Sequence, residues 1–128
     1  IASPDVADLL NRVRQPFNCN MLALAAAEAA LEDEDYIRRT LDLNTAGMQQ
    51  LTTAFQAMEL TWIPSSGNFV AVDIKRDAMP VYQALLQEGV IVRPVANYQM
   101  PHHLRVSIGT QYENQRFIEA LIKVLVRV

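Results

Sequence analysis

The 128-residue chain has one cysteine, four glycines and no long uncharged apolar run, and these shortages exclude several classes of protein. A single cysteine, Cys19, allows no internal disulfide and no cysteine-based zinc cluster, and we expect it to be a packed thiol in a reducing compartment. No segment reaches the roughly 18 uncharged apolar residues that cross a bilayer, because the most apolar helical run, residues 21–31, already contains Glu28. We therefore expect a cytoplasmic protein without a membrane partner.

Common catalytic signatures are also missing. The sequence has no glycine-rich phosphate loop and no Gly-x-Ser-x-Gly motif. Its two lysines, Lys75 and Lys123, do not stand in contexts typical of a buried reactive amine. His102 and His103 are adjacent, so their side chains diverge on an extended backbone and make a poor metal pair. We expect no complete catalytic apparatus and no metal site in this chain.

The chain has one short acidic run, residues 32–35, which we interpret as a solvated corner between helices, and no basic run. Fourteen acidic and eleven basic residues give a net charge of -3, and outside this run they are scattered. Because no basic stripe is present, nucleic acid is not an expected partner. The chain begins at Ile1 without an initiator methionine or a basic leader, which we interpret as the start of a fragment of a longer protein.

The N-terminal half carries helical patterns. Helices are predicted from Pro4 to about Gln15, from Asn18 to about Glu32 and from Asp35 to about Met58. The third would span roughly 36 Å, a length typical of a helix that braces two structural units. Gly47 lies within it and indicates a bend or a close contact. We interpret residues 1–58 as a helical inter-domain segment.

Residues 59–128 alternate between short extended runs and helices. Strands are predicted at 60–63, 68–74, 90–94 and 104–110, and helices at 80–88 and 112–126. This order predicts an α/β or layered α+β domain with a small mixed or antiparallel sheet of about four strands and helices on one face. One compact C-terminal domain is expected here.

Arg105 is the strongest functional candidate in this domain. Strand side chains alternate, so Leu104 and Val106 would face the core while Arg105 faces away. Arg93 ends the preceding predicted strand, and if the two strands are neighbours, both guanidiniums converge on one anion. Two such cations repel in an empty site and are favourable around a bound anion. A solvated arginine on an exposed sheet face is the alternative.

Four separated segments carry a family resemblance. They are Arg12–Asn18, Ser66–Phe69, Glu88–Pro94 and Leu104–Thr110, followed by Glu113, Asn114 and Phe117. In this order and spacing they closely resemble the C-terminal part of histidinol-phosphate aminotransferases, over nearly the whole chain. The resemblance implies the small domain of a fold-type I enzyme that uses pyridoxal phosphate, with the helices that join it to the large domain. It also implies a homodimer for the full-length enzyme.

The resemblance assigns substrate-binding roles to three residues. Arg105 corresponds to the arginine that holds the substrate's anionic group, which is the α-carboxylate of glutamate or the phosphate of histidinol phosphate. Arg93 corresponds to a second phosphate-binding arginine, and Asn68 is a candidate for lining the substrate pocket. The cofactor lysine and the other pyridoxal phosphate ligands belong to the absent large domain, so the chain alone is expected to be inactive. The full-length enzyme would convert histidinol phosphate and 2-oxoglutarate to imidazole-acetol phosphate and glutamate.

One departure from the family pattern keeps other functions open. Tyr98-Gln-Met100 stands where relatives often have Tyr-Gly-Leu, so the loop between the arginines lacks the residue best suited to positive φ. The alternatives are an aromatic-amino-acid transaminase, a relative of phosphothreonine decarboxylase, or a non-catalytic module that binds a small anion or a protein.

Overall fold

The computed structural model describes residues 2–127, and the chain divides into two compact units, residues 1–37 and 38–128. The boundary between these units falls within a helix, at Ile37 and Arg38. The predicted division at residue 58 concerns domains of the longer protein, and it stays a prediction. The two units are described separately.

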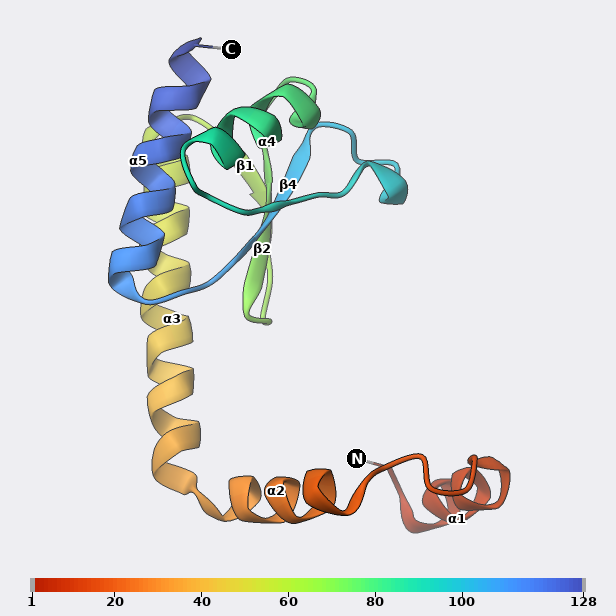
Figure 1. The fold of residues 1–128 in the computed structure, drawn as a ribbon. Coiled ribbons are helices and arrows are strands. Elements are labelled where there is room, and N and C mark those ends of the chain that lie inside the picture. The colour runs from red at the N-terminus through yellow and green to blue at the C-terminus, as the bar shows by residue number, and fades with distance from the viewer. Residues whose placement is uncertain (1, 128) are drawn as a thin grey trace. The chain divides into compact units, whose positions relative to one another are not determined.

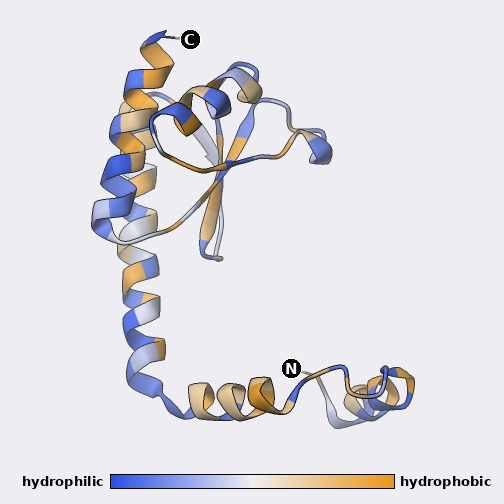
Figure 2. Cartoon of the chain, viewed as in Figure 1, coloured by the Kyte–Doolittle hydropathy of each residue, from blue (hydrophilic) through white to orange (hydrophobic). Residues whose placement is uncertain are grey.

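The first unit contains α1 (Pro4–Val13) and α2 (Met21–Glu32). The Asn20 side chain caps α2 by accepting from the backbone N–H of Ala23 at 2.7 Å. Helix α2 is apolar along most of its length (Figure 2), yet neither helix buries a side chain among the described residues. Cys19 is also exposed, so the prediction of a packed thiol is wrong, because this unit has no core that could enclose it.

Helix α3 (Glu34–Ala57) confirms the predicted long helix. The Asp33 carboxylate caps the N-terminus of α3 by accepting from the backbone N–H of Tyr36 at 2.9 Å. Its C-terminal half is amphipathic and buries Gly47, Leu51 and Phe55. None of the described helices combines the length and the apolar character needed to span a membrane.

The second unit is built on one antiparallel sheet (Figure 1). Within the described residues it has four strands in the order β1-β2-β4-β3. The strands are β1 (Thr61–Ile63), β2 (Phe69–Asp73), β3 (Arg93–Pro94) and β4 (His103–Ser107). All three pairings are antiparallel, so the antiparallel form of the predicted α+β sheet is confirmed and the mixed form is excluded.

Helices cover one face of this sheet, as predicted. Val70, Val72, Leu104 and Val106 point to that face and are almost fully buried. They pack in one core with residues of α3, α4 (Ala78–Gln87) and α5 (Gln111–Arg127). The Phe55 and Phe117 rings meet edge to face at 6.3 Å between centroids, which ties α3 to α5. Within the described residues of this unit, no α-helix covers the other face of the sheet (Figure 1).

The strand predicted at residues 90–94 is mostly wrong. Only Arg93 and Pro94 pair with β4. Gly89 takes a positive φ of 75° after α4, and the Val90 N–H donates to the Leu85 carbonyl at 2.9 Å, so the chain is still closing the helix at this point. Val90 and Val92 are buried in the core without joining the sheet.

Candidate functional site

The uncovered face of the sheet carries both candidate arginines. The strand register pairs Ile63 with Ala71, Ala71 with Arg105, and Arg105 with Arg93. Directly paired residues of antiparallel strands point to the same face, so these four side chains form one row across the sheet. Leu104, the neighbour of Arg105 in the chain, is completely buried under the helices. Arg105 and Arg93 therefore lie next to each other on the face that the helices leave open.

No counter-ion for this pair is supplied by the described residues. Within residues 2–127, neither guanidinium has a carboxylate oxygen within 4 Å. Like charges directly opposite each other in a sheet destabilise it. An external anion between the two cations would remove this cost and use their N–H donors. The register is compatible with an anion site between the two side chains.

The Arg105 side chain is partly buried and rests on an aromatic ring. Its Cζ lies over the Phe69 ring at 5.0 Å from the centroid, within the range of a cation–π contact. Phe69 opens β2 and pairs with Ser107, which makes it a diagonal neighbour of Arg105 on the same face. Sequence reasoning missed this residue, although the alternation in Phe69–Asp73 places Phe69 opposite the buried valines.

A cavity of about 310 Å³ lies beside Arg105. Its walls come from β1 and the turn after it, from β2, and from the loop between the two arginines. The lining residues are Ile63, Pro64, Ser65, Phe69, Ala71, Val95, Tyr98, Met100 and Arg105. Most of these side chains are apolar, and Arg105 is the one charged group among them. Such a lining suits a ligand that combines an anionic group with a less polar body.

The loop between the arginines turns through a left-handed residue. After the short 3-10 helix η1 (Ala96–Tyr98), Gln99 takes φ 61° and ψ 29°, and its N–H donates to the Ala96 carbonyl at 2.9 Å. This is the position at which relatives were expected to have glycine. A non-glycine residue in this region costs roughly 1–2 kcal/mol, so the turn is kept at some expense in stability. It brings Tyr98 and Met100 to the cavity wall.

The segment after β4 is held by hydrogen bonds from α5. Asn114 is buried, and its amide accepts from the Gly109 N–H at 2.9 Å and donates to the Gly109 carbonyl at 3.1 Å. Glu113 accepts from the backbone N–H and from the hydroxyl of Thr110, both at 2.8 Å, and these bonds lower the pKa of its carboxyl group. The Thr110 hydroxyl in turn accepts from the Glu113 N–H at 3.3 Å, which completes a capping box. Together these hydrogen bonds fix the segment that directly follows β4, the strand that carries Arg105.

Asn68 is not brought to the cavity. It precedes β2, and its backbone carbonyl accepts from the Ile108 N–H at 2.8 Å. Its side chain is exposed and does not line the space beside Arg105. A substrate-binding role for Asn68 stays a prediction with no supporting contact in this unit.

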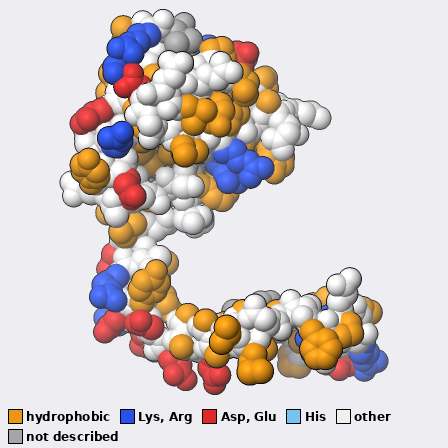
Figure 3. Space-filling view, in the orientation of Figure 1, with side chains coloured by type: hydrophobic (Ala, Val, Ile, Leu, Met, Phe, Trp, Pro, Cys, Tyr) orange, Lys and Arg blue, Asp and Glu red, His pale blue; other side chains and the backbone are white. Residues whose placement is uncertain are grey.

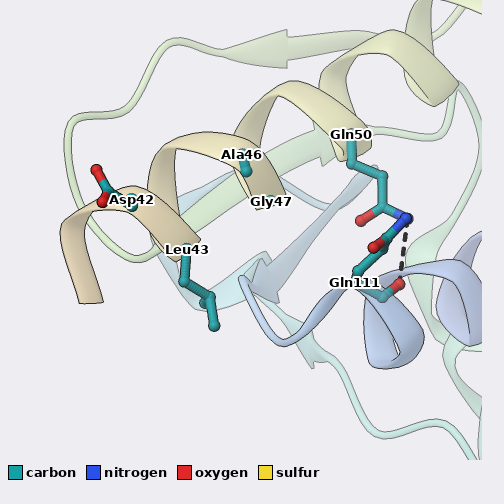
Figure 4. A pocket seen from close by; sticks show the side chains of 6 residues that line it. All are labelled: Asp42, Leu43, Ala46, Gly47, Gln50 and Gln111. Atoms are coloured by element: carbon teal, nitrogen blue, oxygen red, sulfur yellow. Dashed lines mark hydrogen bonds between the residues drawn. The ribbon is translucent and has the colours of Figure 1, made fainter. Parts of the chain in front are cut away.

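A second cavity, of about 570 Å³, lies between α3 and the start of α5 (Figure 4). Its lining residues are Asp42, Leu43, Ala46, Gly47, Gln50 and Gln111. The Gln50 side-chain amide donates to the backbone carbonyl of Gln111 at 3.2 Å, which bridges the two helices. The lining holds no cation, so this cavity does not suit an anionic ligand.

The chain belongs to the class I and II aminotransferase family. The sequence model of that family matches residues 1–121, which is nearly the whole chain. The four-stranded antiparallel sheet and the helices on one face agree with this assignment.

Within the family, the chain is similar to histidinol-phosphate aminotransferases. It is 65% identical over 127 residues to histidinol-phosphate aminotransferase 2 of Pseudomonas fluorescens, covering 99% of this chain and 34% of that protein. It is 66% identical over 125 residues to the enzyme of the same name from Pseudomonas aeruginosa, covering 98% and 34%. The chain thus spans about a third of the length of these curated relatives.

Solved structures show the same fold. The histidinol-phosphate aminotransferase of Sinorhizobium meliloti, in complex with pyridoxal-5'-phosphate, superposes with a TM-score of 0.82 at 28% identity, over 97% of this chain and 35% of that one. The histidinol-phosphate aminotransferase of Clostridium acetobutylicum gives a TM-score of 0.85 at 22% identity, over 97% and 39%, which supports the fold alone. The resemblance that the sequence motifs predicted is confirmed.

Proposed function

We propose that this chain is the C-terminal domain of a histidinol-phosphate aminotransferase and that it supplies the arginines that bind the anionic group of the substrate. The observation that supports this role is the register that sets Arg93 opposite Arg105 on the uncovered sheet face. The identity of 65% with a histidinol-phosphate aminotransferase supports the choice of substrate. The reaction would use histidinol phosphate and 2-oxoglutarate and yield imidazole-acetol phosphate and glutamate.

The chemistry of the site fits both half-reactions. The Arg105 guanidinium can give two parallel N–H bonds to a carboxylate or to a phosphate. Arg93 adds a second positive charge beside it, which matters most for a phosphate because that group carries nearly two negative charges at neutral pH. Fixing the anionic group of the substrate on a strand orients the amino group, which lies only one or two carbons away, and the apolar cavity wall limits the access of water.

The cofactor of the proposed enzyme is pyridoxal phosphate, which serves as an electron sink in amino-group transfer. Neither lysine of this chain suits the cofactor. Lys123 is paired with the Glu88 carboxylate at 2.5 Å, and Lys75 is exposed after β2 in a turn closed by Asp73. Glu88 also pairs with Arg127, and these two cations, Lys123 first, lower the pKa of its carboxyl group. The cofactor would therefore be held by the part of the longer protein outside this chain, and the chain alone would be inactive.

The first unit fits a role as a contact surface for that longer protein. Large apolar side chains of α1, of α2 and of the segment between them are exposed, among them Leu9, Leu10, Phe17, Met21 and Leu22 (Figure 3). Exposed apolar surface of this extent is typical of an interaction site. We propose that the large domain covers it in a cytoplasmic homodimer.

The test is a substrate comparison with the full-length gene product. Amino transfer to 2-oxoglutarate should be far faster with histidinol phosphate than with phenylalanine. A clear preference for phenylalanine would contradict the proposed substrate and favour an aromatic-amino-acid transaminase. Absence of transamination with both donors, in a folded protein that has bound pyridoxal phosphate, would contradict the proposed reaction.

A further inference from the structure

We propose that Phe69 is a positioning residue of the anion site: its ring supports the Arg105 guanidinium and holds the N–H donors in the orientation that a substrate anion needs. This inference rests on the proposed function, because it presumes that Arg105 binds the substrate. It adds a residue to which neither the sequence motifs nor the family resemblance assigned a role.

The contact itself is well defined. The Arg105 Cζ lies 5.0 Å from the centroid of the Phe69 ring, over its face. Attraction between a cation and the negative face of a ring acts within about 6 Å. Arg105 also has no salt bridge with the described residues, and the ring is a contact that favours one position of the guanidinium.

An aromatic ring is a suitable support for this purpose. A carboxylate would also hold the arginine, but it would occupy the N–H donors and compete with the substrate anion for them. The Phe69 ring has no hydrogen-bond acceptor, so it stabilises the cation and leaves its donors free. The ring also forms part of the cavity wall, where it lowers the polarity around the bound anion.

The backbone around Phe69 is held by the sheet and by a helix. It pairs with Ser107 in the sheet, and the turn before it is closed by a hydrogen bond from the Gly67 N–H to the Ser65 hydroxyl at 3.1 Å. The Asn44 amide of α3 donates to the Gly67 carbonyl at 3.2 Å and anchors the same turn. These contacts hold the backbone at Phe69 and in the turn before it, and the strand geometry then sets the direction of the side chain.

The experiment uses the full-length enzyme with Phe69→Leu, Phe69→Tyr and Leu86→Ala. Phe69→Leu removes the ring and should raise the KM for histidinol phosphate and for 2-oxoglutarate by about 5-fold, with kcat changed by less than about 2-fold. Phe69→Tyr keeps the ring and should stay near the wild-type KM. Leu86→Ala is the control, because Leu86 is as exposed as Phe69, at 40%, but lies on α4, which packs against the other face of the sheet.

A double variant separates positioning from general packing. In the Arg105→Gln background no guanidinium remains to be positioned, so Phe69→Leu should raise the KM no further. The same rise in both backgrounds, or no rise in the wild-type background, would overturn the role of Phe69 and leave the proposed function intact. If Arg105→Gln alone keeps wild-type kcat/KM, the proposed function fails, and the role of Phe69 fails with it.

Discussion

Arg105 combines a fixed backbone with a planar, two-pronged cation. Strand β4 sets the direction of its side chain, the Phe69 ring supports its head, and the described residues supply no carboxylate to neutralise it. A lysine at this position would keep the charge and lose the paired N–H bonds, because an ammonium is a point charge on a flexible stem.

Arg105→Lys should therefore weaken the proposed reaction strongly. We expect a loss of about 2 kcal/mol or more in transition-state binding, which is roughly a 30-fold fall in kcat/KM. The measurement is steady-state kinetics of the full-length enzyme with histidinol phosphate and 2-oxoglutarate. Wild-type kcat/KM in a correctly folded variant would contradict the assignment of Arg105 to substrate binding.

Arg93 should distinguish phosphorylated from unphosphorylated substrates. It is exposed and lies at the edge of the sheet, where it adds charge beside Arg105. Arg93→Ala should raise the KM for histidinol phosphate about 10-fold, or about 1.4 kcal/mol, and change the KM for phenylalanine by less than about 2-fold. Neither Arg93 nor Arg76 lines the cavity beside Arg105. Arg76→Ala serves as the control, because Arg76 is an exposed arginine that lies on no strand and is not paired with Arg105. Equal effects of Arg93→Ala on both substrates would contradict a phosphate-binding role.

Helix α3 and the segment after β4 approach each other closely at Gly47. A Cβ at this position would lie 2.4 Å from the Ile108 Cγ2 and 2.8 Å from the Asn114 Nδ2. Ile108 follows β4 directly and Asn114 lies in the first turns of α5, so the small residue in α3 lets both of these segments pack closely against the helix. The sequence indicates either a bend or a close contact at Gly47, and the structure confirms the close contact.

Gly47→Ala should destabilise the second unit in spite of the better helix propensity of alanine. Overpacking costs roughly 1–3 kcal/mol, and alanine returns about 1 kcal/mol in a helix. We expect a net loss of about 1 kcal/mol, measured by urea unfolding. The fluorescence of Trp62, the single tryptophan, reports this unit because its ring packs against Phe55. Gln49→Ala, at an exposed position of α3, is the control and should leave the urea concentration at the unfolding midpoint nearly unchanged. Equal unfolding midpoints for the two variants would contradict the close contact at Gly47.

Helices and strands differed in how far periodicity could predict them. The stripe of α3 and the alternation of β2 and β4 are local patterns, and the structure has these elements close to the predicted positions. Helix α4 begins at Ala78 and not at the predicted Pro80, because Asp77 caps it by accepting from the Met79 N–H at 3.0 Å. Strand β3 is only two residues long, and no local pattern separates it from the buried valines before it.

The candidate site depends on the pairing of strands, which cannot be read from the sequence alone. Alternation placed Arg105 on the face away from the core, but the loop from Val95 to His102 allows several registers between β3 and β4. The observed register sets Arg93 directly opposite Arg105. The Phe69 contact is diagonal and joins two strands distant in the sequence, so it too required the fold.

The two units differ in what stabilises them. The second unit has a continuous core that joins the sheet to three helices. The first has two helices of 10 and 12 residues without a buried side chain among the described residues, and isolated helices shorter than about 12–15 residues are marginal in water. Residues 1–37 should therefore depend on the rest of the longer protein for their stability.

Hydrogen exchange should show this dependence directly. In the isolated 128-residue chain, peptides from residues 1–37 should exchange nearly as fast as an unfolded chain, because little packing opposes local opening. In the full-length protein the same peptides should be protected at least about 10-fold, since burying the apolar faces of α1 and α2 would stabilise both helices. Peptides from α5, which buries one face in the core, should be protected in both proteins and serve as the internal control. Equal protection of residues 1–37 in the two proteins would mean that no other part of the enzyme covers these helices.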